Sequence, residues 1–242
     1  MITNEISDIE FTKRLNEVNY FFTSLDTLYK FFDQKQSMVL KNKLHTEELT
    51  YSDFLIILKS NAYLMLYNLI ESTIRSFIQK IYDEITIQDL GYKDIRQELQ
   101  KIWINVSYDS LGHTTTNFDQ HKDKAKDMIS FVISDQKITL TEDDIHLSGN
   151  IDYRLIKELF KNHGLETPAR HEHGSKVGRG LSEIKSKRNT IAHGNISFID
   201  SARDTSLLDL TVYKDEIIDY LRLLNQNVSS YIDQQNYRLI SP

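Results

Sequence analysis

Apolar side chains recur at helical spacing along most of the chain. They fall three or four positions apart in residues 6–32, which predicts an amphipathic helix there. A second helix of about 35 residues is predicted from Ser52 or Asp53, either of which is a suitable N-cap, to Ile87. The centre of this second helix, AYLMLYNLI at 62–70, is apolar on all sides. A helix with that pattern is buried all round, so we expect residues 53–85 to form the central helix of a bundle.

The remaining pattern predicts shorter helices joined by polar segments. The helices are expected at 91–108, with Trp103 as a packing residue, at 118–134, from Asn150 to Gly164, and from Ser206 to Tyr237. Residues 35–48 read as a connection, and 137–150 have short alternating runs that predict a small strand pair outside the core. No repeat or interdomain linker is evident. The prediction is one all-α domain over residues 1–242, with a long central helix and a polar insertion at about 106–150.

Composition narrows the function classes. The chain has no cysteine, which excludes a disulfide scaffold and a Cys-ligated metal site. It shows no secretory signal and no apolar run long enough to span a membrane, so a cytoplasmic protein is expected. The net charge of −6 disfavours broad adhesion to nucleic acid. However, nine Lys or Arg residues and four Glu residues lie between positions 154 and 188. This local excess predicts either an RNA-binding surface or a solvated basic face.

The segment 181–198, LSEIKSKRNTIAHGNISF, carries the strongest candidate chemistry. Leu181, Ile184 and Ile191 mark the apolar face of a helix, and Arg188 lies on that same face. An inward guanidinium needs an acid, a phosphate or water, because it cannot lose its charge. His193 follows five residues later and precedes Gly194, a residue type that commonly ends helices. We therefore expect Arg188, Asn189 and His193 to occupy the last turns of one helix.

Two charged residues on the predicted central helix need partners. Glu71 follows the buried run directly, and Arg75 is four residues further on, at the spacing of an intrahelical pair. One interpretation is that Glu71 and Arg75 bind each other. The other is that one of them reaches Arg188 or a substrate pocket and supports the site.

Other chemistries find little support. His171, Glu172, His173 and nearby His163 do not have the spacing of a metal site, so none is predicted. GSKVGRG at 174–180 lacks the P-loop pattern, and no G-x-S-x-G sequence is present. The glycine-rich segment 164–180 is predicted to be a mobile loop before the motif helix. Lys176 and Arg179 in that loop, with Lys185 and Lys187 on the helix, are the candidate RNA-binding residues.

The motif R-N-T-I-A-H-G at 188–194 resembles the HEPN superfamily (higher eukaryotes and prokaryotes nucleotide-binding domains), in the group that reads R-N-x-x-A-H-G. The flanking IKSK and NISF, NLIESTIR at 68–75 and GNIDYRLIKELFKNHG at 149–164 are similar to that group too. The resemblance implies a metal-independent endoribonuclease that needs no cofactor and cleaves single-stranded RNA at a site shared across a homodimer. It also implies an antitoxin or regulatory protein as partner.

The residue types fit that chemistry. Histidine can take and give protons near neutral pH, and arginine can hold charge that builds on a phosphate. Asn189 could orient the phosphate or the imidazole. On an ideal helix Arg188 and His193 point about 140° apart, so two copies would surround one phosphate more easily than one. Two alternatives remain: a non-catalytic RNA- or nucleotide-binding module, and a helical interaction protein in a defence complex.

Overall fold

The computed structural model describes residues 2–32, 38–109, 118–147, 149–168 and 176–239. Within these ranges the protein is built from α-helices and short 3₁₀ turns and contains no β-strand, which confirms the all-α prediction. The helices are α1 (Ile2–Phe32), α2 (Met38–Leu44), α3 (Tyr51–Ile87), α4 (Gln97–Asp109), α5 (Phe118–Ile133), α6 (Tyr153–Asn162), α7 (Lys176–Ala192), α8 (Phe198–Ala202) and α9 (Leu207–Asp233).

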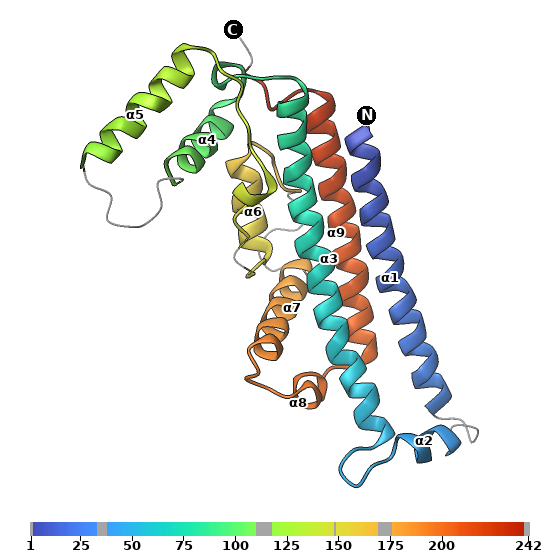
Figure 1. Ribbon diagram of the computed structural model, residues 1–242. Helices are drawn as coiled ribbons and strands as arrows, with labels where there is room; N and C mark the ends of the chain where they lie inside the picture. Colours follow the sequence, from blue (N-terminus) through green and yellow to red (C-terminus); the bar gives the residue numbers. More distant parts are fainter. Residues whose placement is uncertain (1, 33–37, 110–117, 148, 169–175, 240–242) are drawn as a thin grey trace.

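The long helix α3 lies at the centre of the fold. Helices α1 and α9 run beside it over most of its length, and α6 and α7 lie along another side (Figure 1). The side chains of Leu66, Tyr67, Ile70 and Ile74 on α3 are all buried in the same core cluster. Within the run 62–70, Leu64 and Met65 are only partly buried and Asn68 is exposed, so α3 is buried around most of its circumference and not on every side. Removal of this apolar surface from water is the main stabilisation of such a bundle. The predicted central helix is confirmed.

The start of α3 differs from the prediction. Its N-cap is Thr50, not Ser52 or Asp53. The Thr50 hydroxyl accepts a hydrogen bond from the Asp53 amide at 3.3 Å, and the Asp53 carboxylate accepts one from the Thr50 amide at 2.9 Å. This reciprocal capping box satisfies two backbone donors that the first helical turn leaves unpaired. Hydrogen bonds from Thr50 to the carboxylate also lower the pKa of Asp53.

The segment 137–150 does not form the predicted strand pair. It makes one isolated bridge, between Gly91 and Lys137. Ile138, Leu140 and Ile145 are buried in the main core, so this segment packs as part of the bundle and not outside it. The part that projects from the bundle is α4 with α5 (Figure 1). Trp103 on α4 packs between the rings of Tyr92 and Phe131, at centroid distances of 5.3 and 5.0 Å.

Helix limits differ elsewhere as well. Helix α6 is capped by Asp152 and not by Asn150, and α9 ends at Asp233 and not at Tyr237. The short helices α2 and α8 were not predicted. Residues 176–180 were predicted to be loop, but they are the first turns of α7. Gly180 is helical and buried, and a Cβ atom there would lie 3.3 Å from the Tyr213 ring of α9. Glycine at this position therefore allows the two helices to approach closely.

Candidate functional site

Helix α7 ends as the sequence predicts. Leu181 and Ile184 are fully buried and anchor the helix on the bundle. The helix ends at Ala192, and Gly194 follows with a left-handed φ of 69°. The amide of Gly194 donates to the Ile191 carbonyl, and the amide of Asn195 donates to the Thr190 carbonyl, both at 3.0 Å. These are the two hydrogen bonds of a Schellman motif. They fix the backbone around His193, which lies between the last helical residue and the glycine.

Arg188 points inward, as predicted, but its partner is not an acid. The guanidinium carbon lies 4.5 Å from the centre of the buried Tyr67 ring on α3. The Nη1 atom donates to the Gly149 carbonyl at 3.2 Å and to the Asn189 side-chain oxygen at 2.9 Å. Among the described residues, no acceptor lies within hydrogen-bond distance of Nε or Nη2 of Arg188, and no carboxylate pairs with it. A partly buried guanidinium with unused donors can receive a phosphate.

Asn189 uses both ends of its side-chain amide. Its oxygen accepts the hydrogen bond from Arg188, and its nitrogen donates to the side-chain oxygen of Asn150 at 2.7 Å. Asn150 stands 39 residues earlier in the chain, in the turn before α6. Sequence reasoning did not identify Asn150, Gly149 or Tyr67 as part of the site. The segment 149–164, which is similar to the HEPN group, includes Gly149 and Asn150, but the resemblance gave them no role in the site.

Two further residues join the turn before α6 to the same region. The amide of Ile151 donates to the Tyr67 hydroxyl at 3.2 Å. Asp152, the N-cap of α6, binds Lys185 of α7 at 2.6 Å. Burial alone would raise the pKa of Asp152, but the hydrogen bonds from Lys185 and from the Leu155 amide outweigh it, and the net shift is downward. Asp152 is therefore ionised, and its carboxylate binds the ammonium group of Lys185.

His193 differs from Arg188 in its surroundings. Its side chain is exposed, and it makes no hydrogen bond, ion pair or ring contact with the residues that the structure describes. Arg188 lies against Tyr67 on the inner side of α7, and among the described residues no contact joins its side chain to that of His193. The end of α7 thus carries the guanidinium of Arg188, which is fixed by its neighbours, and the exposed imidazole of His193.

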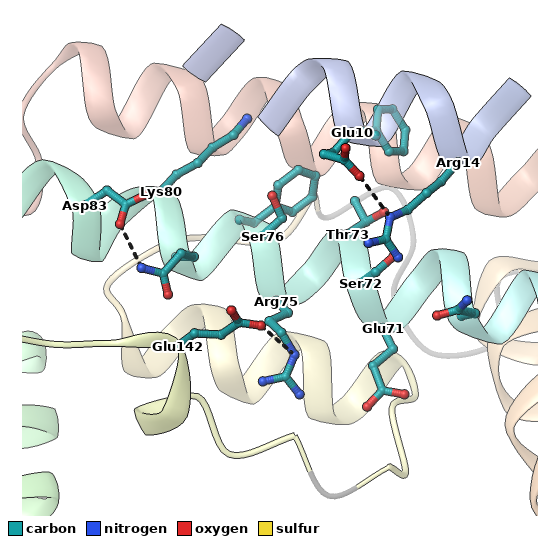
Figure 2. A pocket seen from close by; sticks show the side chains of 14 residues that line it. Glu10, Arg14, Glu71, Ser72, Thr73, Arg75, Ser76, Lys80, Asp83 and Glu142 are labelled. Carbon is teal, nitrogen blue, oxygen red and sulfur yellow. Dashed lines mark hydrogen bonds and ion pairs between the residues drawn. The ribbon is translucent and has the colours of Figure 1, made fainter. Parts of the chain in front are cut away.

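The Glu71–Arg75 pair is not formed. Arg75 instead lies 3.8 Å from Glu142 and donates to the Ile145 carbonyl at 3.4 Å, so it binds the segment after α5. Figure 2 shows the side chains of Glu71 and Arg75 on the side of α3 opposite α1. Arg75 contacts Glu142 there, and Glu71 points away from that contact. Both residues line a groove along α3. Glu71 is close enough to Tyr67 that its negative charge helps to raise the pKa of the phenol, although burial contributes most. Glu71 therefore borders the Arg188 region, whereas Arg75 is bound elsewhere.

The candidate basic residues have different environments. Arg179 on the first turns of α7 is exposed. Lys187 lies 3.9 Å from Glu183, a pair that is exposed enough to contribute little to stability. Lys176 is the first residue of α7, and its side chain lies outside the described part. The three candidates with described side chains are therefore not equivalent, because Lys185 binds a mostly buried carboxylate, whereas Lys187 is near a more exposed one and Arg179 is exposed.

Of the histidines considered for a metal site, His163 is the one that lies among the described residues. His163 is buried, its Nδ1 donates to the Leu159 carbonyl at 2.7 Å, and its Nε2 accepts from the Tyr82 hydroxyl at 2.9 Å. Burial lowers the pKa of His163 to about 4. His171, Glu172 and His173 lie outside the described residues. Across the residues that are described, no group of three or more metal-ligating side chains comes together.

Comparison with known proteins places the chain in a family. The family model described as HEPN_MAE_28990-like HEPN matches residues 4–237. No curated protein and no solved structure matches the chain. In the ranges that the structure describes, no helix has both the length and the apolar character that a membrane span requires. The match covers nearly the whole chain, including the R-N-T-I-A-H-G sequence at the end of α7, and it agrees with the observed all-α fold. The chain belongs to the HEPN superfamily.

Proposed function

We propose that the protein is a metal-independent endoribonuclease that cleaves single-stranded RNA, with Arg188 and His193 as its catalytic residues. The observation that carries this proposal is the arrangement at the end of α7. Arg188 is partly buried, fixed through one nitrogen, and keeps further donors unused among the described residues. His193 is exposed one turn later on a backbone that the Schellman motif fixes.

The reaction follows from these two groups. A ribose 2′-oxygen attacks the adjacent phosphorus, and the bond from phosphorus to the 5′-oxygen breaks. A neutral imidazole takes the proton of the 2′-hydroxyl, and an imidazolium gives a proton to the leaving 5′-oxygen. The guanidinium of Arg188 stabilises the charge on the phosphate oxygens in the transition state. The products are a 2′,3′-cyclic phosphate and a 5′-hydroxyl.

The divergence of the two side chains supports a site made by two copies. Arg188 lies against Tyr67, whereas His193 is exposed to solvent, and this difference supports a site in which the two groups that act on one phosphate come from different chains. A two-fold homodimer would place Arg188 of one copy opposite His193 of the other and would produce two equivalent arrangements. Glu71 supports Arg188 in this proposal through its charge beside Tyr67. Arg75 is assigned to the Glu142 segment instead.

The RNA strand would be guided by the basic residues of α7. Arg179 and Lys187 are the described residues best suited to phosphate contacts, and Lys176 precedes them on the same helix. Lys185 is omitted from the proposed RNA surface, because binding a phosphate would leave the partly buried Asp152 without its cation.

The proposal extends to regulation. An RNase that acts on cellular RNA harms its host, so we propose that an antitoxin or other regulatory protein covers the end of α7 until cleavage is needed. The unbroken family match over 4–237 and one core cluster reaching from Leu15 to Tyr237 support a single functional domain. We place its activity in the cytoplasm, where single-stranded RNA is abundant.

The test is cleavage of an end-labelled single-stranded RNA in the presence of EDTA. The wild type is expected to produce fragments with 2′,3′-cyclic phosphate ends. His193→Ala should reduce the rate on the order of 10²–10⁴-fold. Its thermal unfolding should not change, because the side chain is exposed. A strict Mg²⁺ requirement or full activity in His193→Ala would contradict the proposal. RNA binding without cleavage would favour the non-catalytic module instead.

A further inference from the structure

Four consecutive residues, Gly149 to Asp152, each make one polar contact with the region around Arg188. We refer to them as the 149–152 segment. The Gly149 carbonyl binds Arg188, and the Asn150 side chain binds Asn189. The Ile151 amide binds the Tyr67 hydroxyl, and the Asp152 carboxylate binds Lys185. Four contacts from four successive residues join the turn before α6 to both α7 and α3.

The geometry points to the 149–152 segment as the positioning element of the proposed site, with Asn150 as its key residue. Asn150 fixes the side-chain amide of Asn189. Asn189 in turn fixes which edge of the Arg188 guanidinium faces the substrate. This inference rests on the proposed function, since it explains how the Arg188 of that site is oriented. It also assigns Asn189 a positioning role.

The contacts of Asn189 are the first argument. A primary amide can orient in two ways that exchange its oxygen and nitrogen. The guanidinium of Arg188 has donors only, so it requires the oxygen of Asn189. The Asn150 side-chain oxygen accepts from the Asn189 nitrogen at 2.7 Å and holds the amide in that orientation. The oxygen of Asn189 then faces Arg188, where it accepts from Nη1 at 2.9 Å. With both ends engaged, the orientation of the Asn189 amide is fixed, and one of its two N–H groups remains to donate to a phosphate.

The second argument is that Arg188 is held on one side only. The Gly149 carbonyl and the Asn189 oxygen both accept from Nη1, and the Tyr67 ring lies against the guanidinium. Gly149 has a φ of 69°, a conformation that glycine adopts without strain. This conformation brings its backbone against the guanidinium, where an added Cβ would lie 3.6 Å from Nη1. The remaining donors, Nε and Nη2, are therefore the edge available to a phosphate.

The third argument is that the segment keeps its place without Asn150. The Asp152–Lys185 ion pair, the helix cap that Asp152 provides and the Ile151–Tyr67 hydrogen bond all remain when the Asn150 side chain is removed. Loss of the Asn150 side chain should thus release Asn189 and leave the fold intact. This allows a positioning role to be separated from a general structural one.

The experiment compares Asn150→Ala, Asn189→Ala and the double variant in single-turnover RNA cleavage. Loss of one hydrogen bond in a fixed arrangement should slow cleavage by Asn150→Ala on the order of 10-fold. The affinity for an RNA with a 2′-deoxy substitution at the cleavage site should change much less. The double variant should be no slower than Asn189→Ala, because both residues act through one chain of hydrogen bonds.

A matched control is Asn227→Ala. Asn227 on α9 also donates one side-chain hydrogen bond to a loop, at 3.2 Å to the Glu166 carbonyl, and it has no contact with Arg188. Asn227→Ala should leave the cleavage rate unchanged. If Asn150→Ala cleaves at the wild-type rate, or if its effect multiplies with that of Asn189→Ala, the positioning role is wrong.

A second readout does not depend on activity. In ¹⁵N-labelled protein, the Nε–H resonance of Arg188 should shift or broaden in Asn150→Ala and in Asn189→Ala, and it should stay in place in Asn227→Ala. An Arg188 resonance that Asn150→Ala leaves unchanged would overturn the inference even in a protein that does not cleave RNA. Absence of cleavage by the wild type, with the predicted shift present, would contradict the proposed function and leave the positioning role supported.

Discussion

The two sides of the end of α7 differ sharply, although Arg188 and His193 are only five residues apart. On the inner side, Arg188 lies against Tyr67 and binds Gly149 and Asn189. On the outer side, His193 is exposed and has no side-chain partner among the described residues. The side chain on the inner side is therefore positioned by contacts within the chain, whereas the side chain on the outer side is not. This difference is what a site divided between two copies requires.

On the inner side of α7, a large loss of cleavage rate is expected from replacing Arg188. Arg188→Lys keeps the positive charge but cannot bind Tyr67, Gly149, Asn189 and a phosphate in the same planar geometry. We expect a loss of cleavage rate on the order of 10²-fold, close to that of Arg188→Ala. Unfolding in urea should show a loss of about 1–2 kcal/mol for Arg188→Ala, from the ring contact and the hydrogen bonds.

His193→Ala provides the comparison for the Arg188 variants, because its loss of rate should come without a loss of stability. A lysine variant at position 188 that cleaves at nearly the wild-type rate would mean that Arg188 supplies only general positive charge. The inner side of α7 would then not be organised for phosphate binding.

A second comparison sets the exposed His193 against the buried His163. Burial lowers the pKa of His163 to about 4, whereas an unfolded histidine has a pKa of about 6.5. Between these values the unfolded chain binds the proton and the folded protein does not, so stability falls as pH decreases from about 6.5 to about 4. The expected loss is about 3 kcal/mol.

The measurement is urea unfolding of the wild type and His163→Gln from pH 8 to pH 4. Glutamine is neutral throughout and can accept the hydrogen bond from Tyr82, so the variant should lack this part of the pH dependence. Several carboxylates, including Asp152, also have lowered pKa values. They will contribute to the pH dependence of stability of both proteins near pH 4. Equal pH slopes in the two proteins would show that His163 is not held neutral by burial.

The smallest effect is expected at Gly194, which belongs to the Schellman motif that fixes the backbone beside His193. Its φ of 69° disfavours a side chain, but a Cβ atom would meet no other atom within 4 Å. Gly194→Ala should therefore cost about 1 kcal/mol for conformational reasons alone. Gly194→Asn should cost less, because asparagine tolerates the left-handed region better. Thermal unfolding of both variants tests this order. An alanine variant as stable as the wild type would mean that the turn after His193 is not fixed in this form.

The sequence was informative where the pattern is local. The apolar run at 62–70 identified the central helix. The occurrence of Arg188 on the apolar face and of Gly194 six residues later identified the end of α7. Interactions between distant positions could not be read in this way. The hydrogen bond from Asn189 to Asn150 joins residues 39 positions apart, and the Tyr67 ring comes from a different helix. Neither has a spacing that a single sequence reveals.

Local signals were also misleading in two places. Glu71 and Arg75 have the spacing of an intrahelical pair, but Glu142 and the Ile145 carbonyl compete for Arg75 after folding. The glycines at the start of α7 suggested a loop, whereas Gly180 serves close packing against Tyr213 inside a helix. In both cases tertiary contacts decided between two locally reasonable structures.

The central claim is that Arg188 of one copy and His193 of another act on the same phosphate. The most direct test is to mix inactive Arg188→Ala and His193→Ala chains under conditions that allow subunit exchange, and then to measure RNA cleavage in EDTA. A mixed dimer carries one intact pair, so an equal mixture should recover on the order of one quarter of the wild-type activity. A mixture as inactive as its two components, or a wild-type monomer that cleaves RNA at the full rate, would contradict the shared site.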